Sequence, residues 1–119
     1  MDPIALQQNL DEAAQLLKAL SNPHRLAILC QLLQGEKSVG QLVALIGLSQ
    51  SALSQHLARL RRDRLVRTRR VAQTIYYALD GADAPAMLAT LHELYCRDHV
   101  GVGREAAPAG ASAEPRLLA

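Results

Sequence analysis

Apolar residues recur every three or four positions over most of residues 4–99, and this spacing places them on one face of a helix. The first such run predicts a helix over residues 4–20 with a narrow apolar seam. The seam consists of Leu6, Leu10, Ala13, Leu17 and Leu20. It suits a partner helix, either from the same domain or from a second subunit. Asn22 and Pro23 then favour the start of a second helix, as its cap and its first residue. That helix is expected to bury Leu26, Leu29 and Leu33.

Residues 38–60 carry the pattern of two short helices joined by a tight turn. Ser38 and Gln41 have the spacing of a capping box, in which each side chain accepts from the other residue's backbone N–H. Gly47 suits the left-handed conformation that ends a helix, and Ser49 is a preferred cap for the next one. Three leucines fall together on the inner face of that second helix: Leu53, Leu57 and Leu60. This arrangement is typical of a helix-turn-helix.

The opposite face of the second helix is polar at its start and cationic at its end, and we expect it to lie on DNA. Short hydroxyl and amide side chains suit base edges in a major groove, whereas arginines suit phosphates. The expected DNA contacts from this segment are Ser49, Gln50, Ser51, Ser54, Gln55, His56, Arg59 and Arg62. The alternative is an ordinary solvated face, because surface helices usually have one.

Two runs of β-forming residues, at 65–70 and 74–79, predict a two-stranded hairpin with an exposed tip near residues 70–73. A basic hairpin directly after a recognition helix is a wing, which reaches the flanking DNA backbone or a minor groove. Its expected DNA contacts are Arg67, Arg69, Arg70 and Gln73. The alternative is a surface hairpin with solubilising arginines.

The chain then turns at residues 80–83, which we expect to cap a last helix from about Pro85 to His99. Its apolar stripe would serve as core and dimer surface, and consists of Met87, Leu88, Leu91, Leu94 and Tyr95. Beyond Gly101 the periodicity is lost and Ala, Gly, Pro and Ser dominate. The sequence therefore predicts one domain over residues 1–99 and a disordered tail over residues 100–119.

Charge is concentrated beside the second helix of the pair. Residues 59–70 hold seven of the 13 Lys and Arg residues and one of the 11 Asp and Glu residues, so they carry +6 and the remainder carries −4. Such a stripe is typical of a nucleic-acid binder. No apolar run approaches the roughly 18 residues that span a bilayer, and the acidic N-terminus lacks a signal-peptide pattern. We therefore expect a cytoplasmic protein.

The order helix, helix, helix-turn-helix, basic hairpin, helix over residues 4–99 resembles the ArsR family of bacterial winged-helix repressors. The stretches that carry the resemblance are LLKALSNPHRLAILCQL, SVGQL, LSQSALSQHLARLRRDRLVRTRR and QTIYYAL. The resemblance implies a mainly α winged helix-turn-helix with a small β-hairpin, and a homodimer joined through its first and last helices. It also implies a repressor that binds an inverted repeat in double-stranded DNA, with half-sites about one helical turn apart. Such a protein is not an enzyme and needs no cofactor.

Most members of this family sense metals, but neither of the family's usual sites is present in this sequence. Residues 38–42 lack the Cys-x-Cys pair of the arsenic and lead type, and Tyr95 follows His92 where the zinc type needs His or Glu. Cys30 and Cys96 instead resemble the dithiol branch of the family. That resemblance implies a disulfide or polysulfide bridge within one subunit, formed in response to reactive sulfur species or an oxidant, with release of DNA. We expect Cys96 to attack first.

Other interpretations of the sequence stay open. The two cysteines could be small buried hydrophobic residues, or they could form a non-standard metal site together with Asp98 or His99. A thiol enzyme is a further possibility, although the chain has no Cys-x-x-Cys motif and no Gly-rich phosphate loop. A winged helix that contacts only proteins would bind no DNA in a random-site selection.

Overall fold

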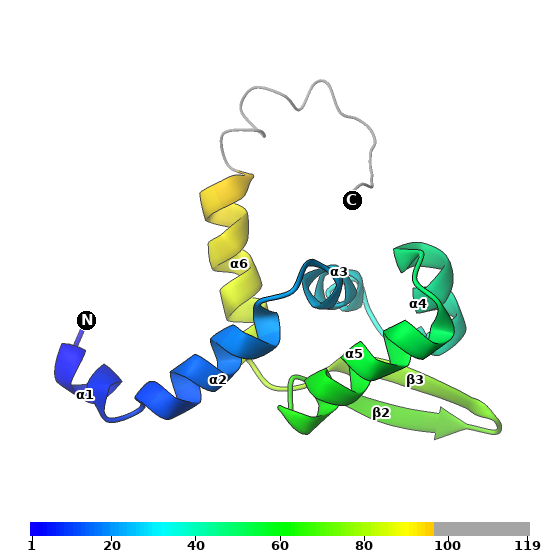
Figure 1. Ribbon diagram of the computed structural model, residues 1–119, viewed down its shortest axis with the longest axis horizontal. Helices are drawn as coiled ribbons and strands as arrows, with labels where there is room; N and C mark the ends of the chain where they lie inside the picture. The colour runs from blue at the N-terminus through cyan, green and yellow to red at the C-terminus, as the bar shows by residue number, and fades with distance from the viewer. Residues whose placement is uncertain (97–119) are drawn as a thin grey trace.

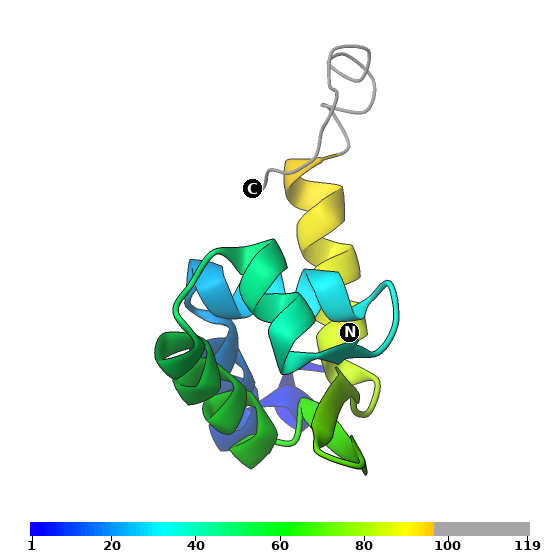
Figure 2. The ribbon, with the colours of Figure 1, turned by 90° about the vertical axis from the view of Figure 1, so that its right-hand side faces the viewer.

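The computed structural model describes residues 1–96, which form a mainly helical fold with a small antiparallel sheet (Figure 1). The elements in chain order are α1 (Pro3–Gln7), α2 (Leu10–Leu20), α3 (Pro23–Leu32), β1 (Lys37–Ser38), α4 (Val39–Ile46), α5 (Gln50–Arg62), β2 (Val66–Val71), β3 (Thr74–Leu79) and α6 (Asp83–Tyr95). The predicted fold class, a winged helix-turn-helix, is confirmed. Figures 1 and 2 both show α6 pointing away from the sheet. Among these described helices, none is long and apolar enough to cross a membrane.

The single helix predicted over residues 4–20 is wrong, because the chain breaks it into α1 and α2 at Asn9. The Asn9 side-chain Nδ2 donates to the Ala5 carbonyl at 2.9 Å. The Asn9 backbone N–H donates to the carbonyl of Leu6, three residues back, also at 2.9 Å. Asn side chains offer the backbone local hydrogen bonds that compete with the helix. The apolar spacing continues through the break and therefore could not reveal it.

Both helices of the helix-turn-helix begin, and the first one ends, where their capping residues predict. The Ser38 N–H donates to Gln41 Oε1 at 2.8 Å, and the Gln41 N–H donates to Ser38 Oγ at 3.1 Å, which completes the capping box of α4. Gly47 ends α4 with φ +85°, in the left-handed region. Ser49 Oγ then accepts from the Ala52 N–H at 3.1 Å and caps α5. Local hydrogen bonding thus fixes the start of the recognition helix.

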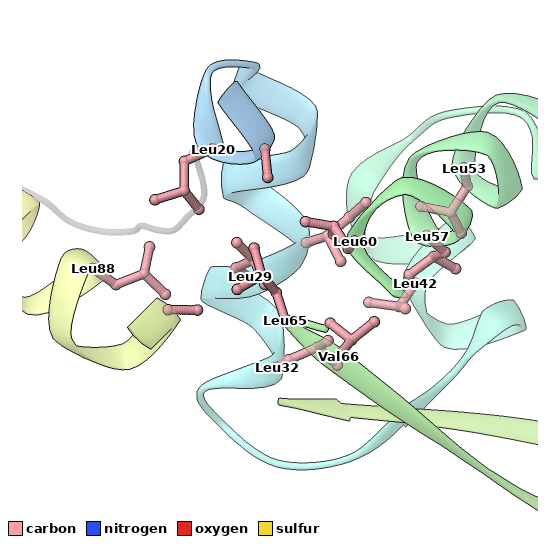
Figure 3. Packing of buried hydrophobic residues seen from close by; sticks show 13 residues of the cluster. Leu20, Leu29, Leu32, Leu42, Leu53, Leu57, Leu60, Leu65, Val66 and Leu88 are labelled. Carbon is pink, nitrogen blue, oxygen red and sulfur yellow. The ribbon is translucent and has the colours of Figure 1, made fainter. Parts of the chain in front are cut away.

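A cluster of leucine, isoleucine, valine and alanine side chains fills the space between α3, α5 and the first turns of α6 (Figure 3). The three predicted core leucines of α5 are fully buried: Leu53, Leu57 and Leu60. Leu33 is 51% exposed, so its predicted burial is wrong. The inward face of α3 instead carries Ile28, Leu29 and Leu32, and Leu33 follows one position past that face.

The wing is an antiparallel hairpin in which Val66 pairs with Leu79 and Val71 pairs with Thr74. Its tip is Ala72 and Gln73, and Ala72 takes a positive φ of 56°. A third strand, β1, pairs with β3 on its other side and was not predicted. Two residues are too short a run to give a strand pattern. The sheet order is β1-β3-β2, so the loop before α4 is joined to the wing.

The last helix begins at Asp83 and ends at Tyr95. Its N-cap position is Ala82, and no side chain caps it, so the predicted cap from residues 80–83 is wrong. Leu88 is buried, whereas Leu94 and Tyr95 are each 68% exposed. The inner part of the predicted stripe is therefore core, and its outer part is largely uncovered by residues 1–96. The predicted helix residues 97–99 and the predicted tail lie outside the described residues.

Candidate nucleic-acid interface

The outward face of α5 presents short polar side chains over its first two turns and an arginine in its last. Because Leu53, Leu57 and Leu60 hold the helix to the core, the opposite side faces solvent. Six of the eight side chains predicted to contact DNA from this segment are exposed: Ser49, Gln50, Ser51, Ser54, Gln55 and Arg62. The structure thus brings these six together on one accessible surface, with hydroxyl and amide groups of the kind that bind base edges.

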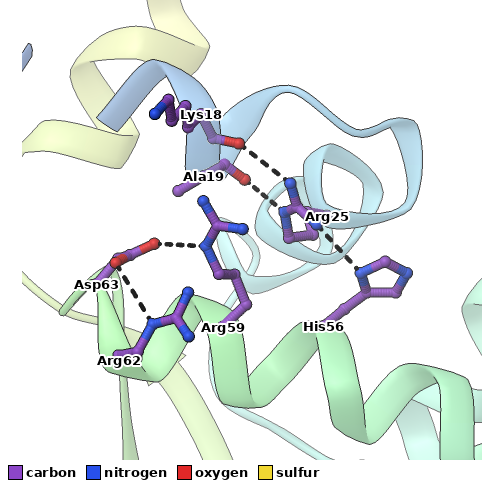
Figure 4. A network of polar contacts seen from close by, with 7 residues as sticks. All are labelled: Lys18, Ala19, Arg25, His56, Arg59, Arg62 and Asp63. Carbon is purple, nitrogen blue, oxygen red and sulfur yellow. Dashed lines mark hydrogen bonds and ion pairs between the residues drawn. The ribbon is translucent and has the colours of Figure 1, made fainter. Parts of the chain in front are cut away.

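The other two predicted contacts, His56 and Arg59, lie at the side of α5 against other parts of the chain (Figure 4). His56 Nδ1 is 3.5 Å from Arg25 Nη1, and the His56 ring centroid is 5.7 Å from that of His24. Burial first, and then the charges of Arg25 and His24, lower the pKa of His56. Arg59 Nε donates to Asp63 Oδ2 at 2.9 Å. Both side chains are therefore partly committed to contacts within the protein.

Arg25 was not predicted to contact other helices, yet it contacts two of them from its place on α3. Its Nε donates to the Ala19 carbonyl at 2.6 Å and its Nη2 donates to the Lys18 carbonyl at 3.1 Å. Its backbone N–H donates to Asn22 Oδ1 at 3.1 Å, in the predicted cap of α3. The only signal for it in the sequence is its place in the first turn of a capped helix, which does not indicate partners on other helices.

The arginines of the wing differ in what they contact. Arg69 forms two hydrogen bonds with the Glu36 carboxylate, at 2.6 and 3.0 Å, and its guanidinium carbon lies 5.2 Å from the centre of the Tyr76 ring. Arg67 donates to the Leu79 carbonyl across the hairpin. Arg70 makes no side-chain hydrogen bond or ion pair with the described residues, and it is exposed near the hairpin tip, as is Gln73. Arg70 is thus the wing arginine whose side chain is not engaged by the rest of residues 1–96.

Glu36 is a second residue that sequence reasoning missed. It lies in the loop before β1, 33 positions from Arg69, and the pairing of β1 with β3 brings the two together. The hydrogen bond from Arg69 lowers the pKa of Glu36, and local burial opposes that shift. The same contact raises the pKa of Arg69. Glu36 therefore lies beside the basic stripe of residues 59–70 and holds Arg69 in place.

The two cysteines are free thiols on different helices. Cys30 lies on the exposed flank of α3, and Cys96 is the half-buried C-cap residue of α6, with its N–H donating to the His92 carbonyl at 2.8 Å. Although Cys30 is exposed as a residue, local burial of its thiol raises its pKa, and the nearby Cys96 raises it further. Over residues 1–96, no cluster of three or more His, Cys, Asp and Glu side chains is placed to hold a metal. Asp98 and His99 lie outside that range.

A capped helix-turn-helix with a polar outward face, followed by an arginine-rich hairpin, defines a winged helix-turn-helix DNA-binding protein. Residues 22–68 match the family model for bacterial regulatory proteins of the arsR family. The transcriptional activator HlyU of Vibrio cholerae is 54% identical over 92 residues, which are 77% of this chain and 85% of HlyU. The biofilm growth-associated repressor of Xylella fastidiosa is 42% identical over 91 residues, covering 76% of this chain and 80% of the repressor.

Solved structures agree with these matches. Reduced HlyU from Vibrio cholerae superposes with a TM-score of 0.72 at 54% identity, covering 78% of this chain and 98% of HlyU. The repressor BigR from Xylella fastidiosa superposes with a TM-score of 0.77 at 41% identity, covering 81% and 98%. The chain belongs to the ArsR family of bacterial transcriptional regulators, and its relatives are regulators rather than enzymes.

Proposed function

We propose that this protein is a homodimeric repressor whose affinity for operator DNA falls when Cys30 and Cys96 of one subunit become bridged. The observation that carries the switch is that Cys30 and Cys96 are both free thiols and that burial, and then the charge of Cys96, raise the pKa of Cys30. One thiol belongs to α3, which packs against the helix-turn-helix, and the other follows α6. A bond between them would connect α3, which supports the DNA-binding helices, to the end of α6, which we propose lies at the dimer interface.

Two recognition helices are needed for an inverted repeat, and exposed apolar side chains support a dimer. They lie on the first helices and at the end of the last one: Ile4, Leu6, Leu10, Leu17, Leu94 and Tyr95. Apolar patches of this kind on a small chain mark a partner surface. A two-fold dimer through these helices presents two α5 helices to successive major grooves, so half-sites would be spaced by about one helical turn. A regulator with this ligand acts where the chromosome is, in the cytoplasm.

The inducer we propose is a reactive sulfur species or an oxidant. In the sulfur route, the Cys96 thiolate attacks the outer sulfur of a persulfide such as glutathione persulfide, which leaves as glutathione. The Cys30 thiolate then attacks the inner sulfur of Cys96 persulfide, forming the disulfide and releasing hydrogen sulfide. Two thiols and one persulfide thus give one disulfide, one thiol and one H₂S. The raised pKa leaves less of Cys30 as thiolate at neutral pH. We therefore give Cys30 the second step, in which the sulfur that it attacks is already held within the same subunit.

The relatives support this assignment in part. The relatives include an activator, HlyU, and a repressor, so the direction of regulation by this chain is part of the proposal. One HlyU structure is described as reduced. A bridge that moves an operator from mostly bound to mostly free must weaken binding by about a hundredfold, or about 3 kcal/mol. It does so only when it fits the DNA-free arrangement of the subunits better than the bound one.

The DNA-binding part is tested by selection from a pool of random duplexes, followed by fluorescence anisotropy with the selected sequence. We expect enrichment of an inverted repeat with half-sites about one helical turn apart, bound by one dimer. A protein that enriches no duplex, while remaining folded and dimeric, would contradict the proposal and favour a winged helix that contacts only proteins.

A further inference from the structure

We infer that Arg25 positions the recognition helix α5 by contacting His56 on the protein-facing side of that helix, and that Arg25 does not itself contact DNA. This inference rests on the DNA-binding function proposed above. The observation is that one planar guanidinium joins three helices. From its place on α3 it reaches the end of α2 through two carbonyls and the side of α5 through His56 (Figure 4).

The contact with α2 is firm. Nε and Nη2 of Arg25 donate to the carbonyls of Ala19 and Lys18, at 2.6 and 3.1 Å, in the last turn of that helix. Carbonyls at a helix end lack partners within the helix, and a cation there is also favoured by the helix dipole. Ala19 is fully buried. These two hydrogen bonds therefore hold the guanidinium at the end of α2, in the position from which it contacts α5.

The contact between Arg25 and α5 restricts the protonation state of the His56 imidazole. For the 3.5 Å contact to be a hydrogen bond, His56 must accept at Nδ1 and carry its ring proton at Nε2, because a guanidinium has only donors. The ring is faced by Arg25 and His24 from α3. Arg59 and Asp63, at the end of α5, act in turn on the charge of Arg25. A protonated His56 would lose its acceptor and add a further cation to this group. The arrangement therefore requires a neutral imidazole.

His56 directly follows Gln55, which lies on the exposed face of α5. A change in the seating of α5 at His56 would therefore misalign the side chains that meet base edges. It would leave the number of phosphate contacts unchanged, since neither Arg25 nor His56 supplies one here. Loss of the Arg25–His56 contact should thus lower sequence specificity and not the electrostatic part of binding, which sets the salt dependence.

The test compares full-length wild type with Arg25→Lys, Arg25→Met and His56→Gln, using the selected inverted repeat and a scrambled duplex of equal length. Arg25→Lys keeps the charge but loses the planar guanidinium, whose separate N–H groups contact α2 and α5. We expect its Kd for the inverted repeat to rise about tenfold, as for loss of a hydrogen bond to a charged group. Its Kd for the scrambled duplex should stay within about twofold, and Arg25→Met should keep the wild-type salt slope. Thermal unfolding of each variant checks that the protein is folded at the assay temperature.

A pH series separates positioning through His56 from a general loss of stability. Wild-type preference for the inverted repeat should fall as the pH is lowered below 6.5, the ordinary pKa of His56. His56→Gln keeps a neutral acceptor and should show a flat profile, whereas the control His92→Gln, at an exposed position on α6, should keep the wild-type profile. Equal losses on both duplexes with a smaller salt slope in Arg25→Met would overturn the inference, as would an unchanged preference in Arg25→Lys. A wild type that binds neither duplex would overturn the proposed function as well.

Discussion

Replacing Arg70 with alanine should reduce the salt dependence of DNA binding, because this side chain is free to contact a phosphate. In the wing, Arg67 donates to the Leu79 carbonyl and Arg69 is paired with Glu36. Arg70 has no such contact with the described residues. The side chain is exposed, so its loss should not affect folding.

The size of the effect follows from the number of wings. Each phosphate contact contributes about 0.9 to the slope of log K against log salt, and a dimer has two wings, so the slope should fall by about 1.8. Over a fourfold increase in salt, wild type should then lose about tenfold more affinity than Arg70→Ala. The loss should be the same on the inverted repeat and on a scrambled duplex, since phosphates carry no sequence information.

The assay is fluorescence anisotropy at several salt concentrations, with Arg69→Ala as the matched control on the same strand. The Arg69 charge is already compensated by Glu36, at 2.6 Å, so its removal should change the slope less. An unchanged slope in Arg70→Ala, or an equal change in both variants, would refute this reasoning.

Three further substitutions test other parts of the account. Gln55→Ala should weaken binding to the inverted repeat by about 1–3 kcal/mol and leave scrambled DNA unaffected; equal loss on both would show that Gln55 does not contact a base edge. Leu57→Ala, at a fully buried position, should lower the free energy of unfolding by about 2–5 kcal/mol in urea titrations. Leu45→Ala, at a 52% exposed position, should cost far less, and similar costs would contradict the described core. Glu36→Gln removes an acid from beside the wing and should tighten binding to both duplexes with a steeper salt slope, whereas weaker binding would show that Glu36 is needed to hold Arg69 in place.

The sequence was most informative where structure depends on neighbouring residues. The capping box of Ser38 and Gln41, the left-handed conformation of Gly47 and the Ser49 cap all depend on residues at most four positions apart, and all were predicted correctly. The apolar period likewise predicted the buried face of α5. These local contacts determine where the recognition helix starts and which side it exposes, and most of the candidate interface follows from them.

Contacts between distant residues could not be predicted in this way. Arg25 meets His56 across 31 positions and Glu36 meets Arg69 across 33, and no spacing rule connects such pairs. Nothing in the sequence therefore indicated that two of the predicted DNA contacts also have partners within the protein: His56 lies against α3, and Arg69 pairs with Glu36. The break at Asn9 escaped prediction for a different reason, because a single side-chain hydrogen bond interrupts a helix whose apolar spacing is continuous.

The most direct test of the proposed switch is operator binding by reduced protein and by protein treated with glutathione persulfide, with the intact mass of each sample measured. Cys30→Ser and Cys96→Ser serve as matched controls that cannot form the bridge. The account predicts that treated wild type acquires a bond within one subunit and binds the operator about a hundredfold more weakly, while neither control loses affinity. Equal binding by the reduced and the bridged protein would contradict it, and would show that the Cys30–Cys96 bond does not control DNA binding.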